Sequence, residues 1–180
     1  MNSICPLILR TVSAVAVVLL LCQCANHKRI VVSVAQQRMI LTDKGKFVKS
    51  YPVSTSKFGT GDVPGSKKTP LGTMRIADKI GGGSRSGTVF KGRKKTGEVL
   101  KPNSQGRDPI VTRILWLKGT QSWNRNAYWR YIYIHGTPEE WRIGSRASYG
   151  CIRMKSRDVI DLYRRVKKGT PVVVVPSYGA

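Results

Sequence analysis

Short runs of apolar and β-branched residues, closed at each end by turn-forming residues, are the feature that most constrains how this chain folds. Such runs are typical of strands. One tight turn, Asp43-Lys44-Gly45-Lys46, joins two of these runs. The alternation of tyrosine and isoleucine before His135 predicts a further strand that ends at this histidine. The strands predicted on this basis span residues 30–35, 38–42, 47–54, 73–77, 110–118, 129–135 and 171–176.

One helix is predicted near the C-terminus. Ser156 is expected as its N-cap, with Asp158 in the first turn, and Gly169 as the residue that stops it. Its apolar stripe consists of Val159, Ile160, Leu162, Tyr163 and Val166. With 180 residues, of which 41% are hydrophobic, the chain is long enough for one domain with a buried core. The sequence therefore predicts a mainly β (β-rich α+β) single domain with one main helix.

Two segments lack the strand pattern. Residues 59–72 are crowded with glycine, proline and threonine, which predicts a loop. Residues 79–107 contain three consecutive glycines and many basic side chains, and Glu98 is their only acid. We interpret this basic, glycine-rich segment as a solvated surface loop with at most short strands, or as a lid or electrostatic clamp.

The N-terminus indicates export. After Arg10 the sequence TVSAVAVVLLLC suits a signal-peptide core and is too short for a membrane span of ~20 residues. Cys22 and Cys24 end this run where a bacterial lipoprotein carries its acylated cysteine, although neither follows the usual small residue. Residues 1–24 are therefore predicted to be a targeting segment that is cleaved, lipid-anchored at Cys22 or Cys24, or retained as an anchor. We expect the protein in the periplasm or cell envelope.

Export leaves the domain with few catalytic side chains. Of the four cysteines only Cys151 lies outside the targeting segment, which excludes a disulfide within the domain. His135 is the only histidine inside it, since His27 lies at the junction, and metal sites built on His and Cys clusters are nearly ruled out. The 32 basic against 9 acidic residues, a net charge of +23, favour an anionic partner such as nucleic acid, a membrane surface or an anionic polymer. Export argues against nucleic acid.

The chemistry of the chain is concentrated between His135 and Cys151. The loop between them is short enough to bring the thiol and the imidazole to one rim. A free cysteine has a pKa near 8.5, so about 3% is thiolate at neutral pH, and a neighbouring imidazole raises that fraction. The amides of Tyr149, Gly150 and Cys151 are expected to stabilise an oxyanion, and Gly150 lets the backbone approach closely. The alternative is that Cys151 is a buried, unreactive small residue.

The segment IHGTPEEWRIGSRASYGCIRM, residues 134–154, resembles the active-site signature of the YkuD-type L,D-transpeptidases of bacterial cell walls. Upstream, KKTPLGTMRI is similar to the TP-x-G stretch of the same family. The resemblance implies one L,D-transpeptidase-like β-sandwich or barrel over residues 29–176. The matching positions of the longer segment are Ile134, His135, Gly136, Thr137, Ile143, Gly144, Arg146, Ser148, Gly150, Cys151, Ile152 and Arg153.

The resemblance also implies roles for individual residues. Cys151 would be the nucleophile, His135 the general base, and the carbonyl of Gly136 the group that orients the imidazole. Tyr149 stands where many members have a histidine, so a mechanism that needs a second imidazole is in doubt here. The implied substrate-binding residues are Ser148, Thr137, Arg153 and Arg146. For each of the two arginines, a structural salt bridge or loop anchor is the alternative.

The implied activity is acyl transfer in two steps without a metal or organic cofactor. The cysteine forms a thioester with a peptidoglycan tetrapeptide stem, D-Ala leaves, and an amine of a neighbouring stem then takes the acyl group. A carboxypeptidase or hydrolase of the same fold is one alternative, and a non-catalytic basic binder of envelope polymer is another. The expected partners are peptidoglycan stem peptides and anionic wall polymer, with membrane anchoring through the N-terminus and no nucleic acid. The resemblance also implies covalent inhibition by carbapenem-type β-lactams.

Overall fold

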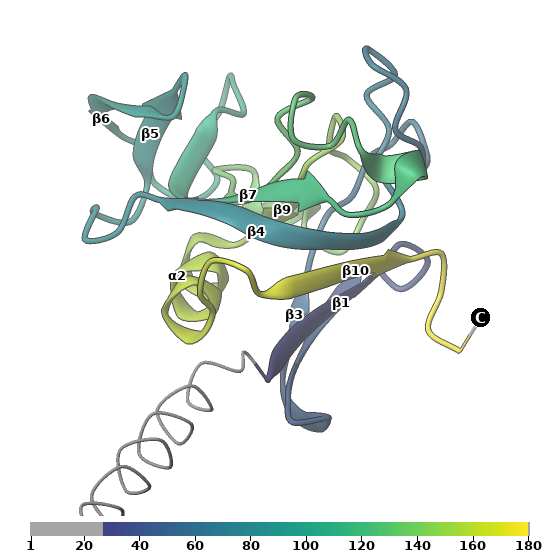
Figure 1. Cartoon of the computed structure of the whole chain (residues 1–180). Coiled ribbons are helices and arrows are strands. Elements are labelled where there is room, and N and C mark those ends of the chain that lie inside the picture. The colour runs from purple at the N-terminus through teal and green to yellow at the C-terminus, as the bar shows by residue number, and fades with distance from the viewer. Residues whose placement is uncertain (1–26, 180) are drawn as a thin grey trace, which may run out of the picture.

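The computed structural model describes residues 27–179, and the strands of this region belong to one sheet (Figure 1). Its main path has the order β3-β2-β1-β10-β4-β7-β5-β6, while β8 pairs with β7 and β9 pairs with β8. Most neighbours are antiparallel, but β1 pairs with β10, and β8 with β9, in parallel. The strands are β1 (Lys28–Ser33), β2 (Arg38–Asp43), β3 (Lys46–Pro52), β4 (Gly72–Ile80), β5 (Thr88–Lys91), β6 (Lys94–Val99), β7 (Ile110–Gly119), β8 (Tyr133–Gly136), β9 (Ile152–Met154) and β10 (Pro171–Val175).

The sheet curls until its two ends meet. Just after β3, Ser54 and Arg153 of β9 exchange two backbone hydrogen bonds of 2.9 Å. Hydrogen-bonded neighbours therefore follow one another from β3 through β2, β1, β10, β4, β7 and β8 to β9 and back to the residues just after β3. The predicted mainly β fold with one α-helix is confirmed for the described residues, and the circuit is barrel-like.

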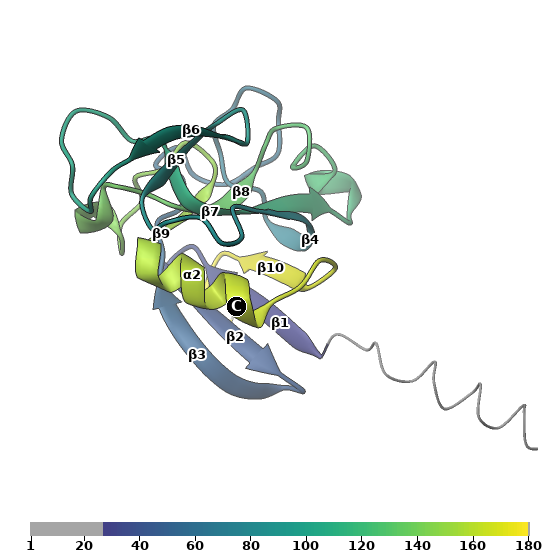
Figure 2. The same cartoon turned by 90° about the vertical axis from the view of Figure 1, so that its left-hand side faces the viewer.

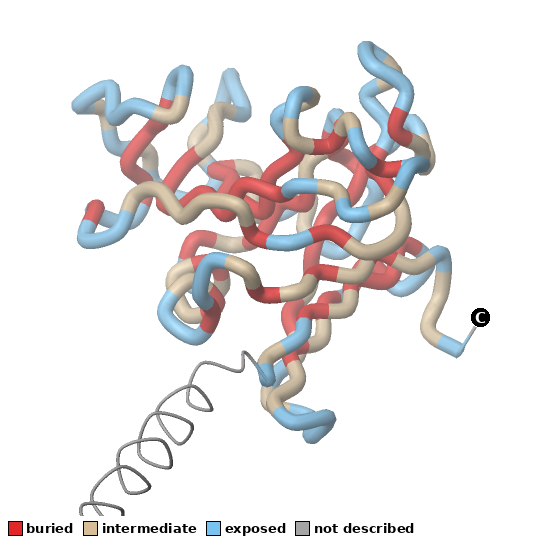
Figure 3. The backbone as a smooth tube through the Cα atoms, in the orientation of Figure 1, coloured by how far each residue is buried: buried red, intermediate tan, exposed pale blue. Residues whose placement is uncertain are grey.

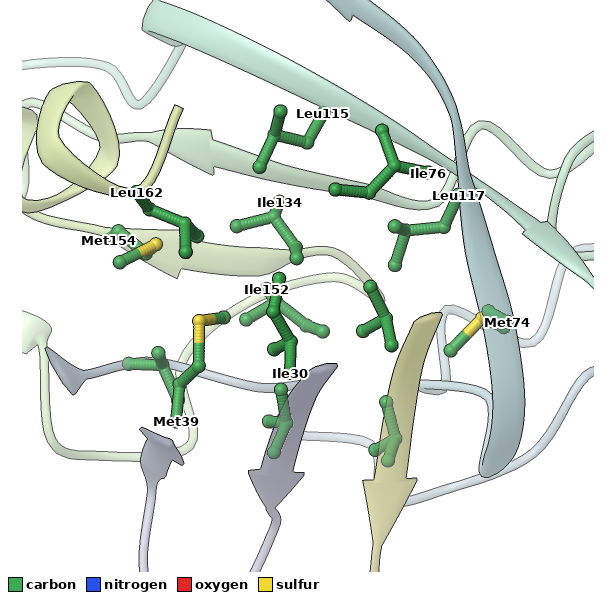
Figure 4. Close-up of a cluster of buried hydrophobic side chains, with 14 of the residues drawn as sticks. Ile30, Met39, Met74, Ile76, Leu115, Leu117, Ile134, Ile152, Met154 and Leu162 are labelled. Atoms are coloured by element: carbon green, nitrogen blue, oxygen red, sulfur yellow. The ribbon is translucent and has the colours of Figure 1, made fainter. Parts of the chain in front are cut away.

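The hydrophobic core fills the inside of this curled sheet. In Figure 4, Ile76 of β4 faces Ile30 of β1 across the inside of the sheet, and Ile134 of β8 lies between them. The helix α2 (Ser156–Arg165) lies over an open side of the curled sheet (Figure 2). It inserts Leu162, which is fully buried, into the core. Burying a leucine side chain contributes roughly 1.5–3 kcal/mol. The buried backbone follows the strands and the inner face of the helix, whereas the exposed backbone lies mostly in the connections (Figure 3).

The strand predicted at residues 129–135 is wrong in its first half. β8 begins only at Tyr133, and residues 129–131 form turns in which Tyr131 has a left-handed φ of 56°. The Tyr131 amide donates to the carbonyl of Tyr128 at 3.1 Å. The ring of Tyr128 stacks on Trp116, with 4.1 Å between the centroids. The aromatic side chains thus pack on one another across β7, and the alternation in sequence does not reflect a pleated strand.

The ends of α2 also differ from the prediction. Its N-cap is Lys155 rather than Ser156, whose amide instead donates to Glu140 Oε1 at 2.7 Å. The helix stops at Arg165 because the next residue, Val166, turns into the core with an extended ψ of 158°. Gly169 lies further on, with a φ of 83° in the turn that leads into β10. The apolar stripe was predictable, whereas the exact stop depends on which residue reaches the core.

The basic segment of residues 79–107 contains the short hairpin of β5 and β6. Arg93, in the turn between the two strands, lies over the rings of Trp116 and Tyr131, at 4.6 Å and 5.2 Å from their centroids. The hairpin therefore folds over the aromatic side chains beside β7 and β8. The predicted targeting segment, with Cys22 and Cys24, lies outside the described residues. No helix of the described part is long and apolar enough to cross a membrane.

Candidate active site

Cys151 lies directly before β9, which runs parallel to β8, the strand that carries His135. Ile134 pairs with Ile152 and His135 with Arg153 in this register, so Cys151, which precedes Ile152, lies beside Tyr133. The N–H of Tyr133 donates to Cys151 Sγ, and the thiol donates to the carbonyl of Tyr131, both at 3.4 Å. Cys151 and His135 both line one cavity of about 140 Å³. The parallel pairing thus brings the thiol and the imidazole to one site.

The imidazole of His135 is held in one tautomer. Its Nδ1 lies 2.8 Å from the carbonyl oxygen of Gly136, the residue predicted to orient it. A carbonyl oxygen only accepts hydrogen bonds, so Nδ1 carries the proton and Nε2 keeps a lone pair. Burial lowers the pKa of His135 below its usual value of 6.5, and the nearby charges of Asp108 and Arg153 act in opposite directions. The ring is therefore neutral at pH 7 and able to accept a proton.

The thiol of Cys151 is protonated at rest. Burial raises its pKa to about 11, and this effect exceeds the opposing effects of the Tyr133 N–H and of the charges on Arg130 and Arg153. A pKa four units above neutrality corresponds to roughly one thiolate in 10⁴ molecules at pH 7. The resting site is thus a thiol beside a neutral imidazole, and its reactivity requires proton transfer as the sulfur attacks.

The loop that presents Cys151 is fixed by side-chain hydroxyls. Ser148 Oγ donates to the carbonyl of Cys151 at 2.6 Å and accepts from the Gly150 N–H at 3.2 Å. Thr69 Oγ1 donates to the carbonyl of Gly150 at 3.0 Å. Gly150 has a φ of 121°, and a Cβ there would lie 3.3 Å from the carbonyl oxygen of Lys68, so glycine is the residue that fits best. Ser148 therefore supports the backbone around the nucleophile.

The three predicted oxyanion donors are not equivalent. The Gly150 N–H already donates a hydrogen bond to Ser148 Oγ. Within residues 27–179 the backbone N–H groups of Tyr149 and Cys151 make no hydrogen bond. These two amides are available as donors next to the thiol.

Arg153 is buried in an ion-pair network. Its side chain is 2% exposed and pairs with Asp108 and with Glu139, the latter at 3.1 Å. Thr137, another residue predicted to bind substrate, donates its hydroxyl to the same Asp108. Arg153 and Asp108 also line the cavity that contains Cys151. Arg153 is thus engaged in the structural salt bridge that the sequence left open as an alternative, and it borders the site at the same time.

Arg146 does not line the cavity of Cys151. It is exposed and lines a second cavity, together with Lys57 and Trp141.

Two residues that contribute to the site were not identified from the sequence. Asp108 is one of only 9 acidic residues in a strongly basic chain. This scarcity of acids was the one feature of the sequence that could have pointed to Asp108 as the partner of a site arginine. Within the described region no three His, Cys, Asp or Glu side chains are grouped closely enough to hold a metal ion.

The second missed contributor, Thr69, comes from the TPLG stretch. It accepts from the Ser56 N–H at 3.0 Å while it supports Gly150, so the two sequence segments that resemble one family meet at this hydroxyl. Residues 27–174 match the family model described as YkuD, L,D-transpeptidase catalytic domain. The chain belongs to this family.

Relatives of the YkuD family agree with this placement. The chain is 28% identical to YcfS of Escherichia coli K12 over 155 residues, 84% of this chain and 45% of that protein. It is also 28% identical to YkuD of Bacillus licheniformis over 153 residues, 82% of this chain and 66% of that protein. Both are named L,D-transpeptidases. The chain thus spans less than two thirds of the length of either relative.

The fold also matches solved structures of L,D-transpeptidases. LdtMt1 in complex with imipenem superposes with a TM-score of 0.53 and 20% identity, over 83% of this chain and 59% of that one. At such identity the likeness concerns the fold alone. In this YkuD-family domain the position between Ser148 and Gly150 is Tyr149, whose ring packs 5.7 Å from Phe58 and lies under the ammonium of Lys57.

Proposed function

We propose that this protein is a cysteine-dependent L,D-transpeptidase that acts on peptidoglycan stem peptides. The observation that carries the proposal is that Cys151 and His135 line the same cavity, with Nδ1 of the imidazole bound to the Gly136 carbonyl. This arrangement leaves Nε2 as the base for the thiol. Membership of the YkuD family supports the choice of substrate class.

In the first step, Sγ of Cys151 attacks the carbonyl carbon of an L-to-D peptide bond in a tetrapeptide stem. Nε2 of His135 takes the thiol proton as the S–C bond forms, because the resting thiol holds its proton. The amides of Tyr149 and Cys151 donate to the oxyanion. When the tetrahedral intermediate collapses, the C–N bond breaks, the imidazolium returns the proton to the leaving amine, and D-Ala departs. A thioester remains on Cys151.

In the second step, an amine of a neighbouring stem attacks the thioester. His135 removes a proton from this amine as the new C–N bond forms, and the C–S bond then breaks. The proton returns to the sulfur, and the resting thiol is restored with a crosslink as the product. If water takes the place of the amine, the same groups perform carboxypeptidase chemistry.

Charge and targeting support a location in the cell envelope. The whole chain has a net charge of +23, and only one basic residue, Arg10, lies in the targeting segment, so the domain keeps nearly all of the positive charge that attracts anionic wall polymers. We propose that the protein is exported and works in the periplasm or envelope, where its targeting segment is lipid-anchored at Cys22 or Cys24, cleaved, or retained as an anchor. Replacing both cysteines by serine and measuring the membrane-bound fraction tests the anchor.

Product analysis tests the proposed reaction. Purified protein is incubated with a disaccharide-tetrapeptide, and D-Ala, tripeptide and crosslinked dimer are measured by mass spectrometry. The transpeptidase predicts D-Ala together with dimer, and Cys151→Ser should yield neither. Release of D-Ala with tripeptide alone would identify a carboxypeptidase. A folded wild-type protein that releases no D-Ala would favour a non-catalytic polymer binder and contradict the proposal.

A further inference from the structure

A second cavity, of about 290 Å³, lies near the cavity of the nucleophile. It is lined by Lys57, Trp141, Arg142, Ser145, Arg146 and Ala147. Three of these residues are cationic and none is acidic. Trp141 is 67% exposed and forms an apolar wall, with the guanidinium of Arg142 4.7 Å from its ring centroid. The cavity thus combines positive charge with a flat aromatic surface.

The positive charge of this second cavity is largely unneutralised. Among the described residues Arg146 has no acidic partner, and the Lys57 ammonium contacts Tyr149 Oη, at 3.2 Å, and aromatic rings rather than a carboxylate. Arg142 lies 3.5 Å from Glu139, but Glu139 also pairs with the buried Arg153. Cations gathered without counter-charges repel one another and favour an anionic ligand.

Backbone hydrogen bonds hold part of the wall of the second cavity, which continues along the chain to the residues beside the nucleophile. The amide of Ala147 donates to Thr55 O at 3.0 Å, and the amide of Lys57 donates to Ser148 O at 3.1 Å. Ser148 and Tyr149, which follow Ala147 in the chain, line the cavity of Cys151. The chain therefore passes directly from the lining of one cavity, at Ala147, to that of the other, at Ser148. Lys57 borders one cavity and touches Tyr149 of the other.

We infer that the second cavity binds a carboxylate of a stem peptide while the reacting carbonyl lies at Cys151. The inference rests on the proposed function for the identity of the peptide. A guanidinium presents paired N–H groups that match the two oxygens of a carboxylate, so Arg146 is the main ligand and Lys57 adds a second charge. Trp141 packs against the apolar part of the peptide. The same cations repel an ammonium group, which directs the amine of an acceptor stem away from this cavity.

Calorimetry on the Cys151→Ser protein tests the site without turnover. The titrants are a tetrapeptide stem with free carboxyl groups and the same peptide with those groups converted to carboxamides. The free acid should bind about 3- to 10-fold more tightly, the range expected for charge-assisted contacts at a partly exposed site. Arg146→Gln or Lys57→Gln, added to Cys151→Ser, should reduce that preference and leave the affinity for the amidated peptide unchanged.

Arg29→Gln is the matched control. Arg29 is exposed on β1 and lines neither cavity, and its replacement by glutamine removes the same single positive charge. It should keep the preference for the acid. Equal affinities for the acid and the amide in the Cys151→Ser protein, no measurable binding of either, or an equal loss in Arg29→Gln would overturn the inference.

Turnover with wild-type protein identifies which stem supplies the carboxylate. If the donor supplies it, amidating the donor should lower kcat/KM for D-Ala release about 3- to 10-fold in wild type and hardly at all in Arg146→Gln. If the acceptor supplies it, amidating the acceptor should lower crosslinking by the same factor and leave D-Ala release unchanged. Absence of turnover in the wild type would refute the proposed function, whereas turnover and binding that ignore amidation would refute only the carboxylate site.

Discussion

Removal of the buried guanidinium of Arg153 should destabilise the domain more than removal of any exposed arginine. Arg153 is 2% exposed, and its partners Asp108 and Glu139 are 23% and 22% exposed. Arg153→Met keeps much of the side-chain volume but leaves Asp108 without its cation and Glu139 with only Arg142, at 3.5 Å. Breaking a buried pair in this way costs 3–5 kcal/mol, and the partial exposure of the two acids places the expected loss at about 3 kcal/mol.

Urea denaturation measures this loss. For a domain of this size m is about 2 kcal/mol/M, so a loss of about 3 kcal/mol lowers the midpoint by about 1.5 M at an unchanged m. The double variant Arg153→Met/Asp108→Asn removes the uncompensated charge of Asp108 and should recover roughly 1–2 kcal/mol of the loss.

Arg157→Met is the matched control. Arg157 is 81% exposed and lies 3.6 Å from Asp158, so its removal should change stability by less than about 0.5 kcal/mol. A loss in Arg153→Met no larger than that in Arg157→Met, or a further loss on adding Asp108→Asn, would refute the reasoning.

Three further predictions concern the reaction and the backbone at the site. His135→Gln should slow acylation by imipenem about 10²- to 10⁴-fold in a folded protein, as measured by stopped-flow fluorescence, and an unchanged rate would exclude the imidazole as the base. Because burial lowers the pKa of His135, and protonation removes its lone pair, the acylation rate should fall with acid only below pH 6.5; a midpoint above 6.5 would contradict this assignment. Gly136→Ala should lower the free energy of unfolding by about 1–3 kcal/mol in urea, because its Cβ would lie 2.7 Å from Val111 O, and a neutral effect would show that β7 can yield.

Local pattern was sufficient for most of the fold. The strands near the N-terminus, β7, β10 and the apolar face of α2 follow from runs and periodicities of neighbouring residues. The segment before β8 does not, because Tyr128 and Tyr131 pack around Trp116, a residue on another strand. The end of α2 is likewise decided by Val166 reaching the core. Such choices depend on contacts between distant parts of the chain, which a local pattern does not contain.

The site shows the same division. One sequence segment of the YkuD resemblance, residues 134–154, contains both Cys151 and His135, and the structure adds how the two side chains are held in one cavity. The pairing of Arg153 with Asp108 joins residues 45 positions apart, and Thr69 supports a loop 81 positions away. For Asp108 and for Thr69, the neighbouring residues in the sequence contain no pattern that predicts these contacts. The resting state of Cys151 was also beyond sequence, because its raised pKa results from burial.

Intact-mass spectrometry of the protein after incubation with imipenem tests the nucleophile most directly. We predict a single adduct of one drug mass on the wild type and none on Cys151→Ser, with both proteins shown to be folded by circular dichroism. An adduct that persists in Cys151→Ser would place the nucleophile elsewhere. A folded wild-type protein that forms no adduct would contradict the account that Cys151, with His135 as its base, performs acyl transfer.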